Sequence, residues 1–418
     1  GLLMKRIALI FLVPFNVYAG TPQIIFGSTN SGINTASTSC AQIHGLSGGG
    51  FATAVDRGTG ILSAPGTFSN FRACIDVPPG AGKSFAFTMQ LGTRNSDSPI
   101  TCTISDTNKC CSDVTHSSST VAGDLIRVKA VPSGTPTANT SVGMSVIFTP
   151  TNENNFVVTG VQTGSSASTT YAVLVGATAA RTTTTDTAVP MSPTGTFDSL
   201  YASVNTAPGV GNSWIFTFQT NGSASSITCT ISGTSNTCND VTHSSSTIRG
   251  DTVNVKIVPS GTPASTTLSV GMRFIPTNRG EFPILGNVFN ALNTASNNYV
   301  GVPGGNMSGT AEPTQVSTTT SPSPGFIMKN GTYSVSTAPG GAASYTFAMR
   351  KNQATPAGGP TVVFSGATKT ARDDKYMVFT DTDNLTCQWA PSGTPTAGMF
   401  HAGFTGYFIQ PQITPTFP

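Results

Sequence analysis

Charged residues are scarce in this chain of 418 residues: they make up 9% of it, and three of them are glutamates. Because Glu and Lys are among the best helix formers, a chain poor in both and rich in Gly, Thr, Ser and Pro disfavours helices. The 20 basic residues are spread along the sequence without a basic run. A nucleic-acid-binding surface needs clustered Lys and Arg, so we expect no nucleic-acid partner.

Long apolar runs are also lacking. The most apolar segment, 7–17, falls short of the roughly 20 residues that a membrane-spanning helix needs. It follows the basic start Met4-Lys5-Arg6 and leads into Val17-Tyr18-Ala19, a small-residue cleavage site. This pattern is typical of a secretory signal peptide, predicted to span residues 1–19 with cleavage after Ala19. We therefore expect a secreted, extracellular or cell-surface protein with no integral membrane segment in the mature chain.

An internal repeat is the strongest feature that is present. The segment ITCTISDTNKCCSDVTHSSST from Ile100 recurs as ITCTISGTSNTCNDVTHSSST from Ile227, and each copy continues into VPSGTP and SVGM. A more distant third copy has TAPGGAASYTFAMRKN from Thr337 and APSGTPTAGM from Ala390. A period of about 130 residues is that of a whole domain rather than of a solenoid unit. We expect repeats at 20–158, 159–285 and 286–418.

Apolar residues alternate with polar ones in each copy, which indicates strands with one buried face. Two such strands per copy predict the core, and the Pro-Gly pairs between the runs are typical of turns. The predicted core residues are Phe85, Phe87 and Met89 with Ile126, Val128 and Ala130; Trp214, Phe216 and Phe218 with Val253, Val255 and Ile257; and Tyr345, Phe347 and Met349 with Leu385, Cys387 and Trp389.

Many short strands without helical periodicity predict an all-β protein made of three tandem β-sandwich, jelly-roll-like domains. The motifs GTF, APG.G.S..F, TISGT and PSGTP, clearest over 196–274, resemble jelly-roll-type repeats of secreted bacterial or phage-associated structural proteins. That resemblance covers nearly the whole mature chain. It implies a sandwich fold with a structural or attachment role, and it brings no catalytic residues with it.

The eight cysteines of an exported chain invite disulfide bonding. Cys102 and Cys111 align with Cys229 and Cys238, whereas the third copy has Val362 and Ala371 at those positions. Because both cysteines are absent together, we expect the disulfides Cys102–Cys111 and Cys229–Cys238. The adjacent Cys110 and Cys111 leave the first copy ambiguous, and a Cys40–Cys74 bridge with Cys110 spare is one possibility. Cys387 is expected to be a buried free thiol.

Patterns for catalysis and metal binding are weak. Residues 45–49 fit G-x-S-x-G beside His44, but the Gly-rich flank lacks the helix that a nucleophile elbow needs. Asp113 precedes His116 by three residues, as Asp240 precedes His243, and such positions point to opposite faces of a regular strand. The pair Asp381 and Asp383 offers too few oxygen ligands for calcium. We therefore expect no catalytic residues, no metal site, no cofactor and no enzymatic activity.

The function expected from these features is that of a non-enzymatic extracellular structural or adhesive protein. The alternative is a carbohydrate-binding protein or a virion attachment, receptor-binding protein. Both tryptophans, Trp214 and Trp389, fall on inward positions, which disfavours sugar stacking on them. The expected partners are surface glycans or further copies of the chain, and an oligomer is compatible with the sequence.

Overall fold

The computed structural model of the chain describes residues 20–29, 32–47, 51–53, 59–93, 96–139, 141–165, 167–288, 291–301, 325–380 and 383–409. The expected signal peptide lies outside the described residues. Within them, strands dominate and the one helical element is a single 3-10 turn, η1 (Thr184–Asp186). The expected all-β fold of sandwich domains is confirmed. No helix in the described part is long and apolar enough to cross a membrane.

The first sandwich contains β1 (Gln23–Thr29), β2 (Ser39–Ala41), β3 (Gly45–Ser47), β4 (Gly60–Ile61), β5 (Gly66–Ile75), β6 (Gly80–Gly92), β7 (Ser96–Asp106), β8 (Cys110–Thr120), β9 (Leu125–Ser133) and β10 (Val142–Pro150). One sheet has the order β3-β1-β10-β5-β8. The other has the order β2-β9-β6-β7, with β4 also pairing with β9. Eight of these strands divide equally between the two sheets, which is the eight-strand plan of a jelly roll. One sheet contributes β1, β5, β8 and β10, and the other contributes β4, β6, β7 and β9.

The second sandwich repeats this plan with β11 (Phe156–Thr163), β12 (Thr170–Ala172), β13 (Val175–Ala179), β14 (Val189–Pro190), β15 (Gly195–Val204), β16 (Gly209–Thr220), β17 (Ser223–Gly233), β18 (Thr237–Thr247), β19 (Thr252–Ser260) and β20 (Leu268–Pro276). Its sheets are β13-β11-β20-β15-β18 and β12-β19-β16-β17, with β14 beside β19. The strand orders match those of the first sandwich position by position.

The third sandwich comprises β21 (Glu281–Asn287), β22 (Asn298–Gly301), β23 (Phe326–Val335), β24 (Ser344–Lys351), β25 (Thr361–Ser365), β26 (Thr370–Phe379), β27 (Leu385–Ser392) and β28 (Phe400–Phe408). Its sheets have the orders β21-β28-β23-β26 and β22-β27-β24-β25. All the predicted core residues lie on the inner faces, and none of their side chains is more than 1% exposed. Burial of each large apolar side chain contributes roughly 1.5–3 kcal/mol to folding.

The boundaries between the sandwiches lie slightly earlier than the sequence suggested. The expected divisions after Val158 and Leu285 fall inside β11 and β21. Each of these strands pairs from its first residue with a strand of the sandwich that follows, β11 with β20 and β21 with β28. The chain therefore passes from one sandwich to the next before Phe156 and before Glu281.

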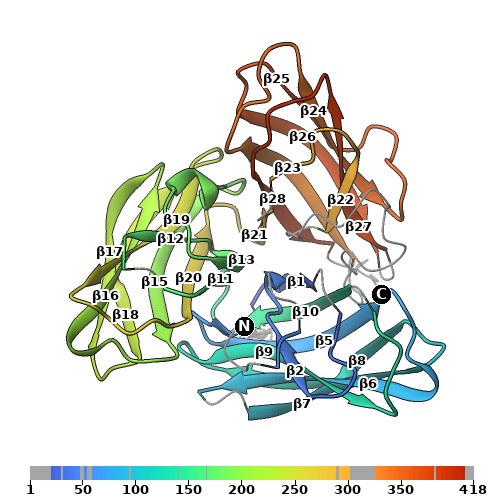
Figure 1. Ribbon diagram of the computed structural model, residues 1–418, viewed down its shortest axis with the longest axis horizontal. Helices are drawn as coiled ribbons and strands as arrows, with labels where there is room; N and C mark the ends of the chain where they lie inside the picture. Colours follow the sequence, from blue (N-terminus) through green and yellow to red (C-terminus); the bar gives the residue numbers. More distant parts are fainter. Residues whose placement is uncertain are drawn as a thin grey trace, which may run out of the picture.

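The three sandwiches surround a common centre and form a closed triangle (Figure 1). The first strand of each repeat, β1, β11 or β21, lies on the inner side of its sandwich (Figure 1). The strands β6, β7, β16, β17, β24 and β25 lie toward the outside.

Candidate functional site

The contact between neighbouring sandwiches is made by a short strand that reaches over the next sandwich. We call β4 and β14 the clasp strands. The main-chain oxygen of Ile61 on β4 lies against Gly271 of β20, where an added Cβ would be 2.1 Å from it. The oxygen of Pro190 on β14 lies equally close to Gly403 of β28, at 1.9 Å from such a Cβ. Only glycine permits this approach at either strand.

Buried polar groups join the first sandwich to the second. The amide of Gln23 pairs with the main chain of Val157, accepting from its N–H and donating to its C=O, both at 2.9 Å. His44 accepts from the N–H of Thr159 through Nδ1 at 3.0 Å, and Gln42 donates to the Thr159 C=O at 3.3 Å. We call these four side chains, of Gln23, Gln42, His44 and Thr159, the polar hub.

The polar hub takes the place of a strand. The neighbour β13 pairs with β11 only from Thr159 onward. The main-chain groups of β11 before that point are met by side chains of the first sandwich, and all four hub residues are buried. A buried amide without a partner costs about 1–3 kcal/mol, so these side chains are required where they are.

The contact between the second and third sandwiches is apolar at the equivalent positions. The paired glycines Gly27–Gly45 of the first sandwich and Gly160–Gly176 of the second occupy equivalent positions. Phe156 precedes Gly160 as Gln23 precedes Gly27, and Val175 precedes Gly176 as His44 precedes Gly45, so these residues correspond. The ring of Phe156 packs on that of Phe282, with centroids 5.9 Å apart. The next residue, Pro283, has no N–H for a glutamine to pair with, so an aromatic contact suits this junction.

The third sandwich returns to the first through Phe326 of β23 and Phe26 of β1, whose ring centroids are 5.6 Å apart. One continuous apolar cluster runs through the second and third sandwiches and includes Ile24 and Phe26. The three junctions therefore differ in chemistry although the sandwiches share one fold. This difference gives each sandwich a defined neighbour.

A buried histidine sits at each of the first two junctions. His44 belongs to the polar hub, and His401 of β28 donates from Nε2 to the C=O of Thr185 in the second sandwich at 3.1 Å. Burial lowers the pKa of His44 to about 4 and that of His401 to about 4. A proton added to Nδ1 of His44 would face the C=O of Thr159, which lies 3.0 Å from that nitrogen and can accept from it, whereas one added to the buried Nδ1 of His401 would find no partner within the described residues. Both side chains are neutral at pH 7.

The G-x-S-x-G match begins on a short strand. Gly45–Ser47 is the strand β3, which pairs in parallel with β1, and residues 48–49 lie outside the described part. The Nδ1 atom of His44 is occupied by Thr159. In the structure this histidine joins two sandwiches.

The aspartate–histidine pairs do meet, contrary to the expectation from a regular strand. The register of β8 shifts opposite Asn70, and this bulge turns Asp113 and His116 to one side, with Oδ2 and Nδ1 2.9 Å apart. Asp240 and His243 have the same arrangement at 2.9 Å. Burial opposes ionisation of both carboxyl groups. Hydrogen bonds from main-chain N–H groups and from the histidine outweigh it and hold the pKa of each aspartate well below its usual range.

These aspartates stabilise the bulge. Asp113 accepts hydrogen bonds from the N–H groups of Thr101, Thr115 and His116 at 2.9–3.1 Å, and it is almost fully buried. The third sandwich retains the aspartate as Asp373, which accepts from the N–H of Thr361 and of Lys375. Because it does so without a histidine, the shared role is structural.

Three disulfides join six of the seven cysteines of the first two sandwiches. Cys102 is bonded to Cys111, and Cys229 to Cys238, each linking the facing edge strands of its sandwich. Closing such short loops contributes roughly 2–3 kcal/mol by the loop-entropy estimate. Val362 and Ala371 occupy the corresponding strands β25 and β26.

The suggested Cys40–Cys74 bridge is wrong. Cys74 is bonded to Cys110, its direct partner across the β5–β8 pair. Cys40 lies on β2 of the opposite sheet and is a buried free thiol. Cys387 is free and buried, as expected, and burial raises its pKa well above the usual value.

Titratable side chains do not gather into a metal site: the described residues contain no group of three or more His, Cys, Asp or Glu placed to hold an ion. Asp383 is held by Lys351 at 2.7 Å and by Asn352 at 2.7 Å. Asp381 lies outside the described residues. Trp214 and Trp389 are each 1% exposed, as their inward positions predicted.

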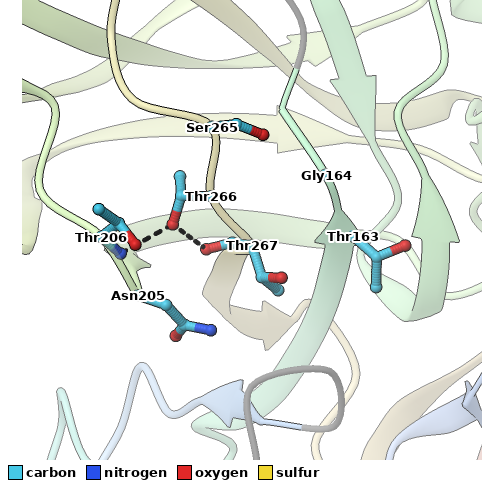
Figure 2. Close-up of a pocket in the computed structure, with 7 residues that line it drawn as sticks. All are labelled: Thr163, Gly164, Asn205, Thr206, Ser265, Thr266 and Thr267. Carbon is cyan, nitrogen blue, oxygen red and sulfur yellow. Dashed lines mark hydrogen bonds between the residues drawn. The ribbon is translucent and has the colours of Figure 1, made fainter. Parts of the chain in front are cut away.

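A polar hollow opens at one end of the second sandwich, where three loops meet (Figure 2). It has a volume of about 410 Å³, and hydroxyl groups dominate its lining. Thr266 is one of the lining residues, and its hydroxyl group accepts from the Thr206 N–H at 2.8 Å and donates to the Thr267 C=O at 3.2 Å (Figure 2). The lining residues are Thr163, Gly164, Asn205, Thr206, Ser265, Thr266 and Thr267. Uncharged donors and acceptors of this kind suit a hydroxyl-rich ligand.

Comparisons with known proteins give no family for the chain. No protein-family description matches it, and neither does any curated protein sequence. Among solved structures, dimeric latent PorU from Porphyromonas gingivalis is similar at a TM-score of 0.21 and 10% identity over 90% of this chain. This chain spans 33% of the length of that structure. A similarity of this size carries no functional information.

Proposed function

We propose that this chain is a non-enzymatic extracellular structural or adhesive protein, in which three sandwiches are fused into one rigid body. The observation that carries the proposal is the closed triangle with its glycine-dependent clasps and buried junctions. Such a body keeps its outer strands at fixed distances from one another. Presentation of several surfaces in fixed relation is what an attachment or scaffold protein requires.

Two further features support the proposal. Disulfides persist in oxidising compartments, and three are present here. The motifs shared with jelly-roll-type repeats of secreted bacterial or phage-associated structural proteins point to the same class of function. The burial of large aromatic and polar side chains is in keeping with a structural role. Trp214, Trp389 and Tyr333 lie in the core, and the residues of the polar hub join the first sandwich to the second.

Fractionation of producing cells tests the proposal. We expect the protein in the exported fraction or on the surface, accessible to added protease. Non-reducing peptide mass spectrometry should show the pairs Cys74–Cys110, Cys102–Cys111 and Cys229–Cys238, with Cys40 and Cys387 alkylated only after unfolding. A cytoplasmic protein with all eight thiols reduced would contradict the proposal.

Carbohydrate binding or virion attachment is the second candidate function. The hydroxyl-lined hollow of the second sandwich favours it, since its lining offers uncharged hydrogen-bonding groups and no charged side chain. A virion protein would be found in assembled particles, and a glycan-binding protein would be retained on immobilised saccharide. Either result is compatible with the adhesive form of the proposal.

A further inference from the structure

The third sandwich has a surface hollow beside β26. It has a volume of about 670 Å³ and lies between the β24–β25 loop and the first half of β26. Its lining residues are Ala357, Gly358, Asp373, Asp374, Lys375 and Tyr376. The hollow therefore combines an aromatic face with charged groups.

Tyr376 is the most exposed aromatic side chain of the described residues, at 64%. In the β23–β26 pair Tyr376 lies opposite Lys329, the residue just before Asn330, which occupies the bulge with a left-handed main chain. At this register position the first two sandwiches have Ser117 and Ser244. The third copy has thus replaced a small hydroxyl group by a large ring on the surface, where folding gains little from it.

The walls of the hollow are held in place by hydrogen bonds. Asp373, whose side chain is 7% exposed, accepts from the N–H of Thr361 at 2.7 Å and from that of Lys375 at 2.8 Å. The ammonium group of Lys375 donates to the C=O of Gly359 at 3.2 Å, which ties β26 to the β24–β25 loop. The ring of Tyr376 therefore stands beside a fixed main chain.

The carboxylate of Asp374 is held but not covered. Arg249 of the second sandwich forms an ion pair with it and also donates to the C=O of Gly331 and of Asp373 at 3.1 and 3.2 Å. The Asp374 side chain is nevertheless 82% exposed. A carboxylate has about four acceptor positions, so an anchored one still has several for hydroxyl groups of a ligand.

We propose that this hollow binds a neutral saccharide. The apolar face of a sugar ring would lie on Tyr376, whose ring is apolar with a polar tip. Two sugar hydroxyls would donate to Asp374, and the ammonium group of Lys375 would donate to a third oxygen. Asp373 and Asp374 balance Lys375 and Arg249 in charge, which favours an uncharged ligand over an anionic one. This inference deepens the adhesive function proposed above and rests on it.

Saturation-transfer NMR with the intact chain tests the inference. The probes are the methyl glycosides of glucose, galactose, mannose and N-acetylglucosamine, followed by titration of whichever gives a signal. Tyr376→Ser introduces the residue that the other two sandwiches have, and it is expected to weaken binding at least tenfold without changing the melting temperature. Asp374→Asn should also weaken binding. Val378→Ser is the control, because Val378 lies on the same strand outside the hollow and is partly exposed.

Two outcomes would overturn the inference. One is that no glycoside gives a signal with the wild-type chain. The other is that Tyr376→Ser binds as well as wild type. If Thr206→Ala abolishes the signal instead, the saccharide binds in the hydroxyl-lined hollow of the second sandwich and not in this one. Export and disulfide content are measured separately, so a failure here is distinguishable from a failure of the proposed function.

Discussion

Replacement of Gly271 or Gly403 by valine is expected to open one junction between sandwiches while leaving each sandwich folded. Both glycines lie in strands with main-chain angles that any residue can adopt, so the substitution is unfavourable only because of the neighbouring sandwich. The first added carbon would be 2.1 Å from the Ile61 oxygen or 1.9 Å from the Pro190 oxygen. A main-chain oxygen cannot rotate away, so we expect a cost at or above the usual 1–3 kcal/mol of overpacking.

Hydrogen exchange localises this effect. Gly271→Val should speed exchange at the N–H of Ile61, which donates to Thr159 Oγ1 at 3.0 Å, and leave β14 protected. Gly403→Val should do the reverse, exposing β14 and the Ser192 contact to Thr405. Ser246→Val on the exposed part of β18 is the matched control and should change neither. Unaltered protection of both clasp strands in both variants would show that the contacts do not hold the sandwiches together.

Acidification from pH 6.5 to 4 is expected to destabilise the protein through His44 and His401. In the folded chain the pKa of each is about 4, below the value of about 6.5 in an unfolded chain. Their neutral forms therefore contribute full stability above pH 6.5, and the unfolded chain takes up protons first as the pH falls. At 1.4 kcal/mol per pKa unit, each histidine removes about 3 kcal/mol of stability by pH 4.

The carboxylates most strongly bound in the fold do not obscure this effect. The pKa values of Asp113 and Asp240 lie well below the usual range, so these groups stay ionised throughout the interval. Chemical denaturation at pH 7, 5.5 and 4.5 measures the loss. His44→Asn places an amide oxygen where Nδ1 accepts from Thr159, and His401→Gln keeps a donor toward Thr185. The double variant should lose most of the slope, and a slope equal to that of wild type would contradict the assignment.

The core could be predicted from the sequence because it depends on local alternation. Phe216, Phe347 and their neighbours alternate with polar residues, and a strand places such residues on one face whatever surrounds it. The copies also aligned well enough to relate Cys102 to Cys229. The pairing of Cys74 was missed because it depends on which strands are neighbours, and β5 meets β8 across 36 residues of sequence.

The junctions between sandwiches could not be predicted in the same way. Gln23 and Phe156 are equivalent within the fold, yet one pairs with the main chain of Val157 and the other packs on Phe282. Nothing near either residue in the sequence indicates its partner, because the partner belongs to another repeat. A buried glutamine at the start of a strand could have signalled an unusual environment, but only the arrangement of three sandwiches explains it.

The exposed aromatic of the third sandwich was missed for a different reason. The two tryptophans are the residues that a sequence first suggests as sugar platforms, and both are in the core. Tyr376 lies in the run Tyr-Met-Val-Phe, where alternation does identify Met377 and Phe379 as the inward pair. The outward position of Tyr376 followed from that pattern, but the hollow beside it depends on the β24–β25 loop.

Small-angle X-ray scattering of the chain from Gly20 onward tests most directly whether the three sandwiches close into one body. A compact chain of this length has a radius of gyration of about 21 Å by the scaling for folded proteins. We expect a value close to that, with a flat three-lobed envelope that is unchanged between low and high salt at pH 7. A clearly larger radius, with the profile of three sandwiches joined in a line, would contradict the closed triangle.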